Sequence, residues 1–243
     1  MSSRYDCSDP TQRATGLRHA RDALARGELV VLPTDTVHGV AADAFSPEAV
    51  AALLAAKGRG RGTPPPVLVA DPRTLDGLAT DVPPVARALA ERFWPGGLTL
   101  VCRAQPSLTW DLGDTGGTVA VRVPDHELAR ELLASTGPLA VSSANRHGRP
   151  AATTTDAAQE QLGSAVAVYL DDGAPVDGAD PADGDPAATA PPSTIVDATS
   201  EPLRVLRQGA VPLAALREVA PDLVGADGST GGTGSTAAPG AAG

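Results

Sequence analysis

Segments with a helical pattern alternate with short apolar segments typical of strands along most of this chain, and this order allows few folds. A helical pattern over residues 11–26 precedes a strand pattern over 28–32, and the same order recurs to about residue 220. Aromatic residues make up only 2% of the chain, so Val, Leu and Ala must form the core. We therefore predict an α/β fold in which helices pack on one twisted, mostly mixed or antiparallel sheet.

Residues that commonly begin and end helices mark several boundaries. Gly27 ends the first helical pattern, and Ser46 with Pro47 begins the next as N-cap and first helical residue. Further helices are predicted over residues 84–93, 125–135 and 155–162, with a short one from residue 212. Further strands are predicted over residues 67–70, 98–103, 118–123, 139–142, 166–170, 193–197 and 203–206.

The chain of 243 residues is long enough for one substantial core, and its composition divides it into a body and three polar segments. We predict a single domain over residues 11–220, preceded by a flexible N-terminus over 1–10. Residues 173–192 hold Ala, Pro, Gly and Asp and are predicted to be a disordered acidic insert. Residues 221–243, mostly small and polar, are predicted to form a flexible tail.

Charge and cysteine content restrict the location and the partners of the protein. Neither a signal peptide nor an apolar stretch of about 20 residues is present, which indicates a cytoplasmic protein without a membrane segment. Cys7 and Cys102 lie far apart, which suits a reducing compartment. The net charge of −10 disfavours a broad nucleic-acid surface, but much of it comes from aspartates in the acidic insert and just before it. A local basic cleft that binds a small anion therefore remains possible.

Lys57 is the only lysine of the chain, and it begins a basic, glycine-rich run that ends at Thr63. Lysine carries a compact ammonium that an arginine does not replace at every site. Glycines allow backbone and cations to close around a polyanion such as a phosphate chain. The alternative is a solvated basic turn after a helix, and this run alone does not distinguish the two.

Polar residues follow or interrupt several predicted strands. Residues 33–39 carry Thr34, Asp35 and Thr36 where the first strand ends, which is a common ligand position in α/β sheets and also a common turn. Arg122 shares a strand face with Thr118, and a buried arginine requires an anion, either a ligand carboxylate or a structural aspartate.

The ends of later strands carry a similar set of groups. Residues 142–145 offer hydroxyls and an amide that suit phosphate oxygens, although an Asx turn has the same composition. Residues 193–197 and 203–209 are predicted to pair as a hairpin that adds Arg204 and Arg207. These two arginines have opposite strand parity, so we expect only one to face a site.

Other catalytic patterns are absent from the sequence. The four histidines show no metal-ligand spacing, and neither a Gly-x-Ser-x-Gly elbow, a Walker loop nor a dinucleotide fingerprint is present. A triad built on Ser143 is not excluded by spacing alone. No metal site is predicted in the protein itself.

Seven short motifs, taken in chain order, resemble those of the threonylcarbamoyl-adenylate synthase family, which is built on the YrdC-type domain. They lie within residues 15–210, and their number and order make the resemblance specific. The motifs occupy residues 33–39, 57–59, 93–99, 121–124, 143–145, 192–197 and 206–209.

The resemblance implies a twisted α/β sheet with a large, basic, concave cavity in a short, single-domain form. It also implies an enzyme, an ATP-dependent nucleotidyltransferase, that joins L-threonine, bicarbonate and ATP into threonylcarbamoyl-adenylate and pyrophosphate. Mg²⁺ would accompany ATP. A separate transferase system would place the threonylcarbamoyl group on adenosine 37 of tRNA. Two alternatives are an RNA-binding module with a basic cavity and carbamoyl transfer to another acceptor.

The resemblance also assigns residues to the two substrates. Lys57 and Arg59 would be catalytic. Three departures from the family pattern affect the threonine pocket or the basic loop: the family usually has Tyr at His38 and Pro at Gly60, and many members have His at Leu68. The implied threonine ligands are Thr36, Thr118, Arg122 and Val141. The implied ATP ligands are Lys57, Arg59, Thr63, Ser143, Asn145, Ser193 and Arg207.

Overall fold

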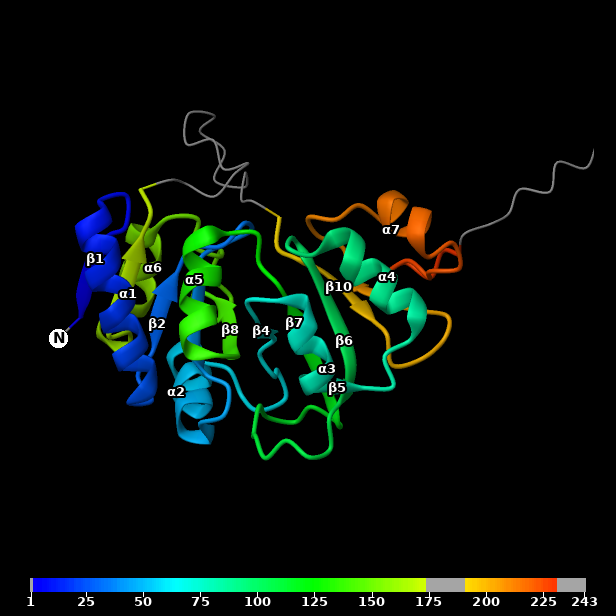
Figure 1. Cartoon of the computed structure of the whole chain (residues 1–243), viewed down its shortest axis with the longest axis horizontal. Coiled ribbons are helices and arrows are strands. Elements are labelled where there is room, and N and C mark those ends of the chain that lie inside the picture. The colour runs from blue at the N-terminus through cyan, green and yellow to red at the C-terminus, as the bar shows by residue number, and fades with distance from the viewer. Residues whose placement is uncertain (1, 174–190, 231–243) are drawn as a thin grey trace, which may run out of the picture.

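The structure is a computed structural model that describes residues 2–173 and 191–230 (Figure 1). Its described strands form one mixed sheet in the order β1-β9-β2-β3-β8-β4-β7-β6-β10-β11, with β5 paired to β6. This confirms the predicted α/β fold. The strands are β1 (Ser3–Asp6), β2 (Val30–Leu32), β3 (Gly39–Asp43), β4 (Val67–Leu68), β5 (Ala79–Thr80), β6 (Leu98–Ala104), β7 (Thr118–Arg122), β8 (Leu139–Ser143), β9 (Val168–Asp171), β10 (Thr194–Asp197) and β11 (Arg204–Arg207).

Helices cover the two faces of the sheet unequally. Helix α1 (Pro10–Ala25) packs on β9, β2 and β3, and α5 (Glu127–Thr136) lies beside it; both helices share one apolar cluster with this part of the sheet (Figure 1). A second, larger cluster lies on the opposite face. The helices that contribute to this second cluster are α2 (Pro47–Lys57), α3 (Leu75–Leu78), α4 (Pro84–Phe93), α6 (Thr155–Leu162) and α7 (Leu213–Val219).

Strand register shows which side chains share the face that carries α1 and α5. In β4, Leu68 belongs to the apolar cluster under these helices and lies opposite Arg122 of β7. On the same face, Ala120 of β7 lies opposite Val101 of β6. Because side chains alternate along a strand, the face continues from the apolar half under the helices into a half that carries Arg122.

Caps fix the end of α2, which carries the lone lysine. The Ser46 side chain accepts a hydrogen bond from the Ala49 amide, as expected for an N-cap. Gly58 adopts the left-handed conformation with φ of 67°, and the Arg59 amide donates to the Leu54 carbonyl. Lys57 is therefore the last helical residue, rather than the first residue of a flexible loop as the sequence predicted.

Three other predictions about chain organisation need correction or fall outside the described residues. Residues 3–6 form strand β1, paired in parallel with β9, so the N-terminus is ordered rather than flexible. Leu223 is buried and the Val224 backbone bonds to Leu203 and Val205, so the body extends beyond residue 220. Residues 174–190 and 231–243, most of the predicted insert and tail, lie outside the described residues.

Strand β3 was not predicted from the sequence. Its residues are mostly Gly and Ala, which have weak strand propensity, yet β3 pairs with both β2 and β8. Residues 33–38 therefore connect two antiparallel neighbours. None of the described helices is long and apolar enough to span a membrane.

Candidate active site

A cavity of about 570 Å³ lies over the half of the sheet face that α1 and α5 leave open. Strand residues form its floor, and the loops at 34–37, 59–66, 142–151 and 192–193 form its walls. Its volume falls in the range of small-molecule sites. The floor residues are Gly39, Leu68, Thr99, Arg122, Val141, Ile195 and Arg207.

Arginines dominate the charge of this cavity. Arg59, Arg122, Arg149 and Arg207 line it, and among the described residues that line it none is Asp or Glu. The pKa of Arg207 is lowered by desolvation first, and then by the positive charges of Arg122 and Arg59. Cations that lie close enough to lower the pKa of Arg207 are favourable together only when an anion enters between them. The cavity therefore suits a polyanion.

Arg122 is held rigidly at the back of the cavity. Its guanidinium donates to the Gly96 carbonyl at 3.0 Å, to Thr36 Oγ1 at 2.8 Å and to Asp35 Oδ1 at 2.6 Å. Burial is the largest cause of its lowered pKa, and Asp35 opposes that shift. The structural aspartate is thus present, and together with Gly96 and Thr36 it leaves two of the five guanidinium N–H groups for a ligand carboxylate.

Hydroxyl groups shape the loop that carries Asp35 and Thr36. The buried Thr34 Oγ1 accepts from the Thr36 amide at 3.2 Å and donates to the Val37 carbonyl at 2.6 Å. The His38 backbone ties this loop to its neighbours, since its amide donates to Ala152 and its carbonyl accepts from Ala144. Thr36 therefore faces the cavity beside Arg122 with little freedom to move.

Strand β8 ends in a polar turn that forms another wall. Ser143 Oγ donates to Asn145 Oδ1 at 2.5 Å, and Asn145 Nδ2 donates to the Arg149 carbonyl at 2.6 Å. Arg59 reaches the same wall and donates to Ser142 Oγ at 3.4 Å. The turn thus combines hydroxyls with nearby guanidinium groups, a composition that suits phosphate oxygens.

Lys57 lies behind this wall rather than in the cavity. Its side chain is 0% exposed, and its ammonium donates to the Asn145 carbonyl at 2.8 Å and Asn145 Oδ1 at 3.1 Å, as well as to the Ser143 carbonyl. Burial, and to a smaller extent the nearby positive charge of Arg59, lower its pKa to about 7. The sequence-based assignment of Lys57 to ATP requires this ammonium to line the cavity. The structure places it behind the wall instead.

The floor of the cavity near β10 and β11 is cross-linked by Ser193. Thr99 Oγ1 donates to Ser193 Oγ at 2.9 Å, and Arg207 donates to the Ser193 carbonyl at 2.7 Å. Strands β10 and β11 pair antiparallel, which confirms the predicted hairpin. Arg207 lines the cavity and Arg204 does not, in agreement with their opposite parity.

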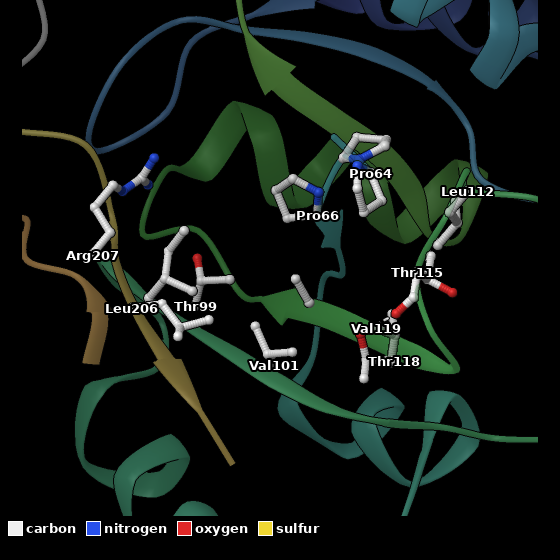
Figure 2. Close-up of a pocket in the computed structure, with 13 residues that line it drawn as sticks. Pro64, Pro66, Thr99, Val101, Leu112, Thr115, Thr118, Val119, Leu206 and Arg207 are labelled. Carbon is white, nitrogen blue, oxygen red and sulfur yellow. Dashed lines mark hydrogen bonds between the residues drawn. The ribbon is translucent and has the colours of Figure 1, made fainter. Parts of the chain in front are cut away.

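A smaller apolar pocket of about 260 Å³ adjoins the cavity (Figure 2). Arg207 and Leu112 lie at its opposite ends, and Pro64 and Pro66 face Val101 across it (Figure 2). It shares Pro64, Pro66, Thr99, Ile195 and Arg207 with the cavity, so the two spaces lie side by side. An apolar slot beside a basic cavity can hold a flat ring with an anionic tail.

The structure brings most of the sequence-predicted site residues together. Thr118 is an exception, because it lines the apolar pocket and donates to the Thr115 carbonyl instead of joining Arg122. Lys57 is the other exception. The predicted residues that line the cavity are Thr36, Arg59, Thr63, Arg122, Val141, Ser143, Asn145, Ser193 and Arg207.

Sequence reasoning missed several lining residues. Arg149 lines the cavity, and its position soon after the 142–145 turn was the available signal. Pro64 and Pro66 were also missed, since prolines after a glycine-rich loop indicate only a turn.

Two departures from the family pattern have different structural consequences. His38 is buried, with Nε2 3.2 Å from Thr155 Oγ1 and Nδ1 without a partner in the described structure, and it does not line the cavity. Burial lowers its pKa. Leu68 does line the cavity and makes that part of its floor apolar. Within residues 2–173 and 191–230, no three His, Cys, Asp or Glu side chains form a group that could hold a metal ion.

An arginine-lined cavity beside an apolar slot, on the open face of a mixed sheet, gives this α/β protein a candidate site for a small anionic ligand. The family model named Sua5_yciO_yrdC and described as "Telomere recombination" matches residues 22–209, and the chain belongs to this family. The match covers most of the described body and all of the cavity walls.

Relatives of known name support the family assignment. A Mycobacterium leprae protein, provisionally named a threonylcarbamoyl-AMP synthase, is 52% identical over 90% of this chain and 94% of its own length. The crystal structure of Pyrococcus abyssi Sua5 complexed with L-threonine is 33% identical, with a TM-score of 0.76, over 84% of this chain and 56% of that one. Escherichia coli YciO is 20% identical with a TM-score of 0.72, and the match spans 89% of this chain and 100% of YciO. At this identity the likeness supports the fold alone.

Proposed function

We propose that the chain is an L-threonylcarbamoyladenylate synthase, an ATP-dependent nucleotidyltransferase that acts on L-threonine and bicarbonate or CO₂. The observation that carries the proposal is the group of arginines on the open sheet face, beside an apolar slot. Related proteins named threonylcarbamoyl-AMP synthase support it. The product would supply the tRNA threonylcarbamoyladenosine modification through a separate transferase system in the cytoplasm.

ATP would lie across the two adjoining spaces. Its base would enter the apolar slot between Pro66 and Val119, where Thr115 and Thr118 offer hydroxyls. Its phosphates would then reach the cavity at the shared residue Arg207. This placement assigns Thr118 to the nucleotide instead of threonine. The groups available to the phosphates are Arg59, Thr63, Ser143, Asn145, Arg149, Ser193 and Arg207.

L-Threonine would lie at the back of the same cavity. Its carboxylate would pair with the free part of the Arg122 fork, next to Thr36. Its methyl group would pack on the apolar floor residues Leu68 and Val141. Arg122 and Arg207 line the same cavity, so the amino acid and the phosphates would bind side by side.

The reaction requires positioning more than proton transfer by side chains. The threonine amine adds to CO₂ with loss of a proton, or condenses with bicarbonate with loss of water, to give a carbamate. A carbamate oxygen then bonds to the α-phosphorus of ATP while the bond to pyrophosphate breaks. Arg59 and Arg207 would stabilise the charge that develops on the phosphoryl oxygens. Mg²⁺ would enter with the ATP phosphates as part of the substrate.

A pyrophosphate-release assay tests the proposal. Release from ATP is expected to require both threonine and bicarbonate, because only the carbamate is the nucleophile. The formation of threonylcarbamoyl-AMP should be followed by mass spectrometry in the same reaction. Equal release when either threonine or bicarbonate is omitted would rule out this chemistry. Tight, salt-sensitive RNA binding without pyrophosphate release would favour the RNA-binding alternative.

A further inference from the structure

Two loops far apart in the sequence are docked on each other beside the apolar slot. They are the α2–β4 loop (residues 58–66) and the β6–β7 loop (residues 105–117). Arg61 donates from both terminal nitrogens to the Asp111 carboxylate, at 2.9 and 2.8 Å. The Arg61 carbonyl also accepts from the Asp114 amide at 2.9 Å. Because the backbone of Arg61 is held as well as its side chain, the contact fixes the position of the α2–β4 loop.

Gly113 allows the two loops to approach this closely. Its φ of 103° is a conformation that residues with a side chain rarely adopt, and a β-carbon there would lie 2.6 Å from the Arg61 carbonyl oxygen. The obstacle is backbone, so a side chain at this position would force one loop away from the other. The Arg61–Asp111 ion pair is exposed and contributes little by itself. The packing at Gly113 therefore sets the distance between the loops.

The docked loops form the end of the apolar slot that lies away from Arg207. Leu112 and Thr115 of the β6–β7 loop lie at this end (Figure 2). The prolines at 64–66 of the α2–β4 loop line the same slot. Because proline has a fixed φ, this segment passes on a displacement of Arg61 instead of absorbing it. The contact between the loops thus sets the width of the slot at this end.

The two ends of the α2–β4 loop are anchored independently of this contact. The Arg59 amide donates to the Leu54 carbonyl at the end of α2. The Pro66 carbonyl accepts from the Val141 amide of β8 at 2.9 Å. Only the middle of the loop depends on the β6–β7 loop. A change at Gly113 should therefore move the slot wall and leave Arg59, which lines the cavity, in place.

We propose that Gly113 is a positioning residue, and that its packing against Arg61 shapes the slot for the base of the nucleotide. The inference rests on the proposed function, which places the base of ATP in this slot. It extends that function, because neither Gly113 nor Arg61 is among the described residues that line the slot. Recognition of the base then depends on a contact between two loops outside the slot.

Two ligands separate the base from the phosphates. An α,β-methylene analogue of ATP carries both, whereas inorganic tripolyphosphate carries the phosphate chain alone. Gly113→Ala should weaken binding of the analogue by about tenfold, as expected for a one-carbon misfit in an apolar pocket. Binding of tripolyphosphate should change by less than about twofold, because Arg59 is anchored elsewhere. Calorimetry on the full-length chain measures both, and an unchanged ratio of the two affinities would overturn the proposal.

Gly116→Ala is the matched control. Gly116 lies in the same loop and has a φ of 60°, but a β-carbon there meets nothing within 4 Å. Alanine at this position strains the backbone without pushing the two loops apart, so both affinities should stay within about twofold of wild type. An equal loss of analogue binding in Gly116→Ala and Gly113→Ala would reduce the effect to loop strain and overturn the positioning role.

A charge reversal decides the matter if thermal melting shows that Gly113→Ala does not fold. Asp111→Arg places two cations against each other on the surface and should lower the ratio of analogue to tripolyphosphate affinity by roughly threefold. The double variant Arg61→Asp/Asp111→Arg should restore the ratio. In that case an unchanged ratio in the single variant, or no recovery in the double variant, would overturn the proposal.

The inference and the proposed function fail in different ways. If the wild-type protein releases no pyrophosphate, the proposed function fails, whereas the binding measurements need no turnover and are read independently. If pyrophosphate release requires threonine and bicarbonate but Gly113→Ala keeps the wild-type ratio of affinities, the proposed function stands and the role of Gly113 is wrong.

Discussion

The two halves of one sheet face differ in what they do. Under α1 and α5 the face carries Leu32, Ala41 and Leu170, which are completely buried against the helices. Beyond these helices the same face carries Thr99, Arg122 and Arg207 and forms the floor of the cavity. Both halves follow the same alternation of side chains. The comparison shows that part of a sheet face can form a binding site where no helix covers it and where polar side chains occupy positions that are apolar elsewhere on the face.

The two halves also contribute differently to stability. Burial of the apolar half stabilises the fold by roughly 25 cal/mol for each Å² removed from water. The open half holds several guanidinium groups close together, which costs stability until an anion binds. Substitutions in the covered half should therefore lower the stability of the fold, and substitutions in the open half should lower the affinity for substrates.

Replacement of the buried arginine should give the largest functional effect. Arg122→Ala is expected to weaken threonine binding by about 2–5 kcal/mol, because a charge-assisted fork to a carboxylate is lost. The affinity for ATP should change much less. Calorimetry with each substrate measures the two effects.

A matched arginine on the covered half provides the control for Arg122→Ala. Arg13 of α1 pairs with Glu127 and Glu131 on the surface, so Arg13→Ala should leave both affinities within about twofold, given the small energies of exposed ion pairs. Normal threonine binding by Arg122→Ala would show that this arginine is only structural.

Truncation of a core leucine on the covered half should give the opposite result. Leu132→Ala in α5 is expected to lower the free energy of unfolding by about 2–5 kcal/mol, since Leu132 is 0% exposed. The KM values at a temperature where the variant is folded should stay the same. Denaturant unfolding and steady-state kinetics measure the two quantities. A large rise in the KM for threonine without a loss of stability would break the division between the halves.

The exchange of the lone lysine should have an intermediate effect. Lys57→Arg is expected to lower turnover about tenfold, because small displacements of groups near a transferring phosphoryl are costly. Thermal stability should also fall, because a longer, planar group must fit a site that is 0% exposed. Wild-type turnover and unchanged thermal stability together would contradict this role for Lys57.

The smallest expected effect concerns the side chain of the amino-acid substrate. Serine should have a lower kcat/KM than threonine, by a factor that corresponds to about 1 kcal/mol, because it lacks the methyl group that would pack on the floor residues Leu68 and Val141. Competition between the two amino acids in the pyrophosphate assay measures this difference. An equal kcat/KM for serine and threonine would show that the methyl group does not contact Leu68 and Val141.

The sequence predicted most of the elements, because caps and periodicity are local signals. It missed β3, whose Gly and Ala residues become a strand only through pairing with β2 and β8. Parity separated Arg207 from Arg204 correctly, because alternation is a property of the strand itself. Parity also grouped Thr118 with Arg122, but these residues lie four positions apart, which is roughly 13 Å along a strand.

The position of Lys57 is the clearest limit of sequence reasoning. A basic, glycine-rich run indicates an exposed anion site, and Arg59 does reach the cavity. The end of α2, however, depends on the Gly58 turn, and the partners of Lys57 come from a turn some 86 residues later. Such long-range contacts leave no pattern in one sequence.

A crystal structure of the chain with L-threonine and an α,β-methylene analogue of ATP is the most direct test of the open half as the catalytic site. We predict the threonine carboxylate on Arg122, the phosphates between Arg59 and Arg207, and the base in the slot beside Thr118. Lys57 should remain behind the wall, bonded to Asn145. Substrates bound elsewhere, with the arginine-lined cavity empty, would contradict the account.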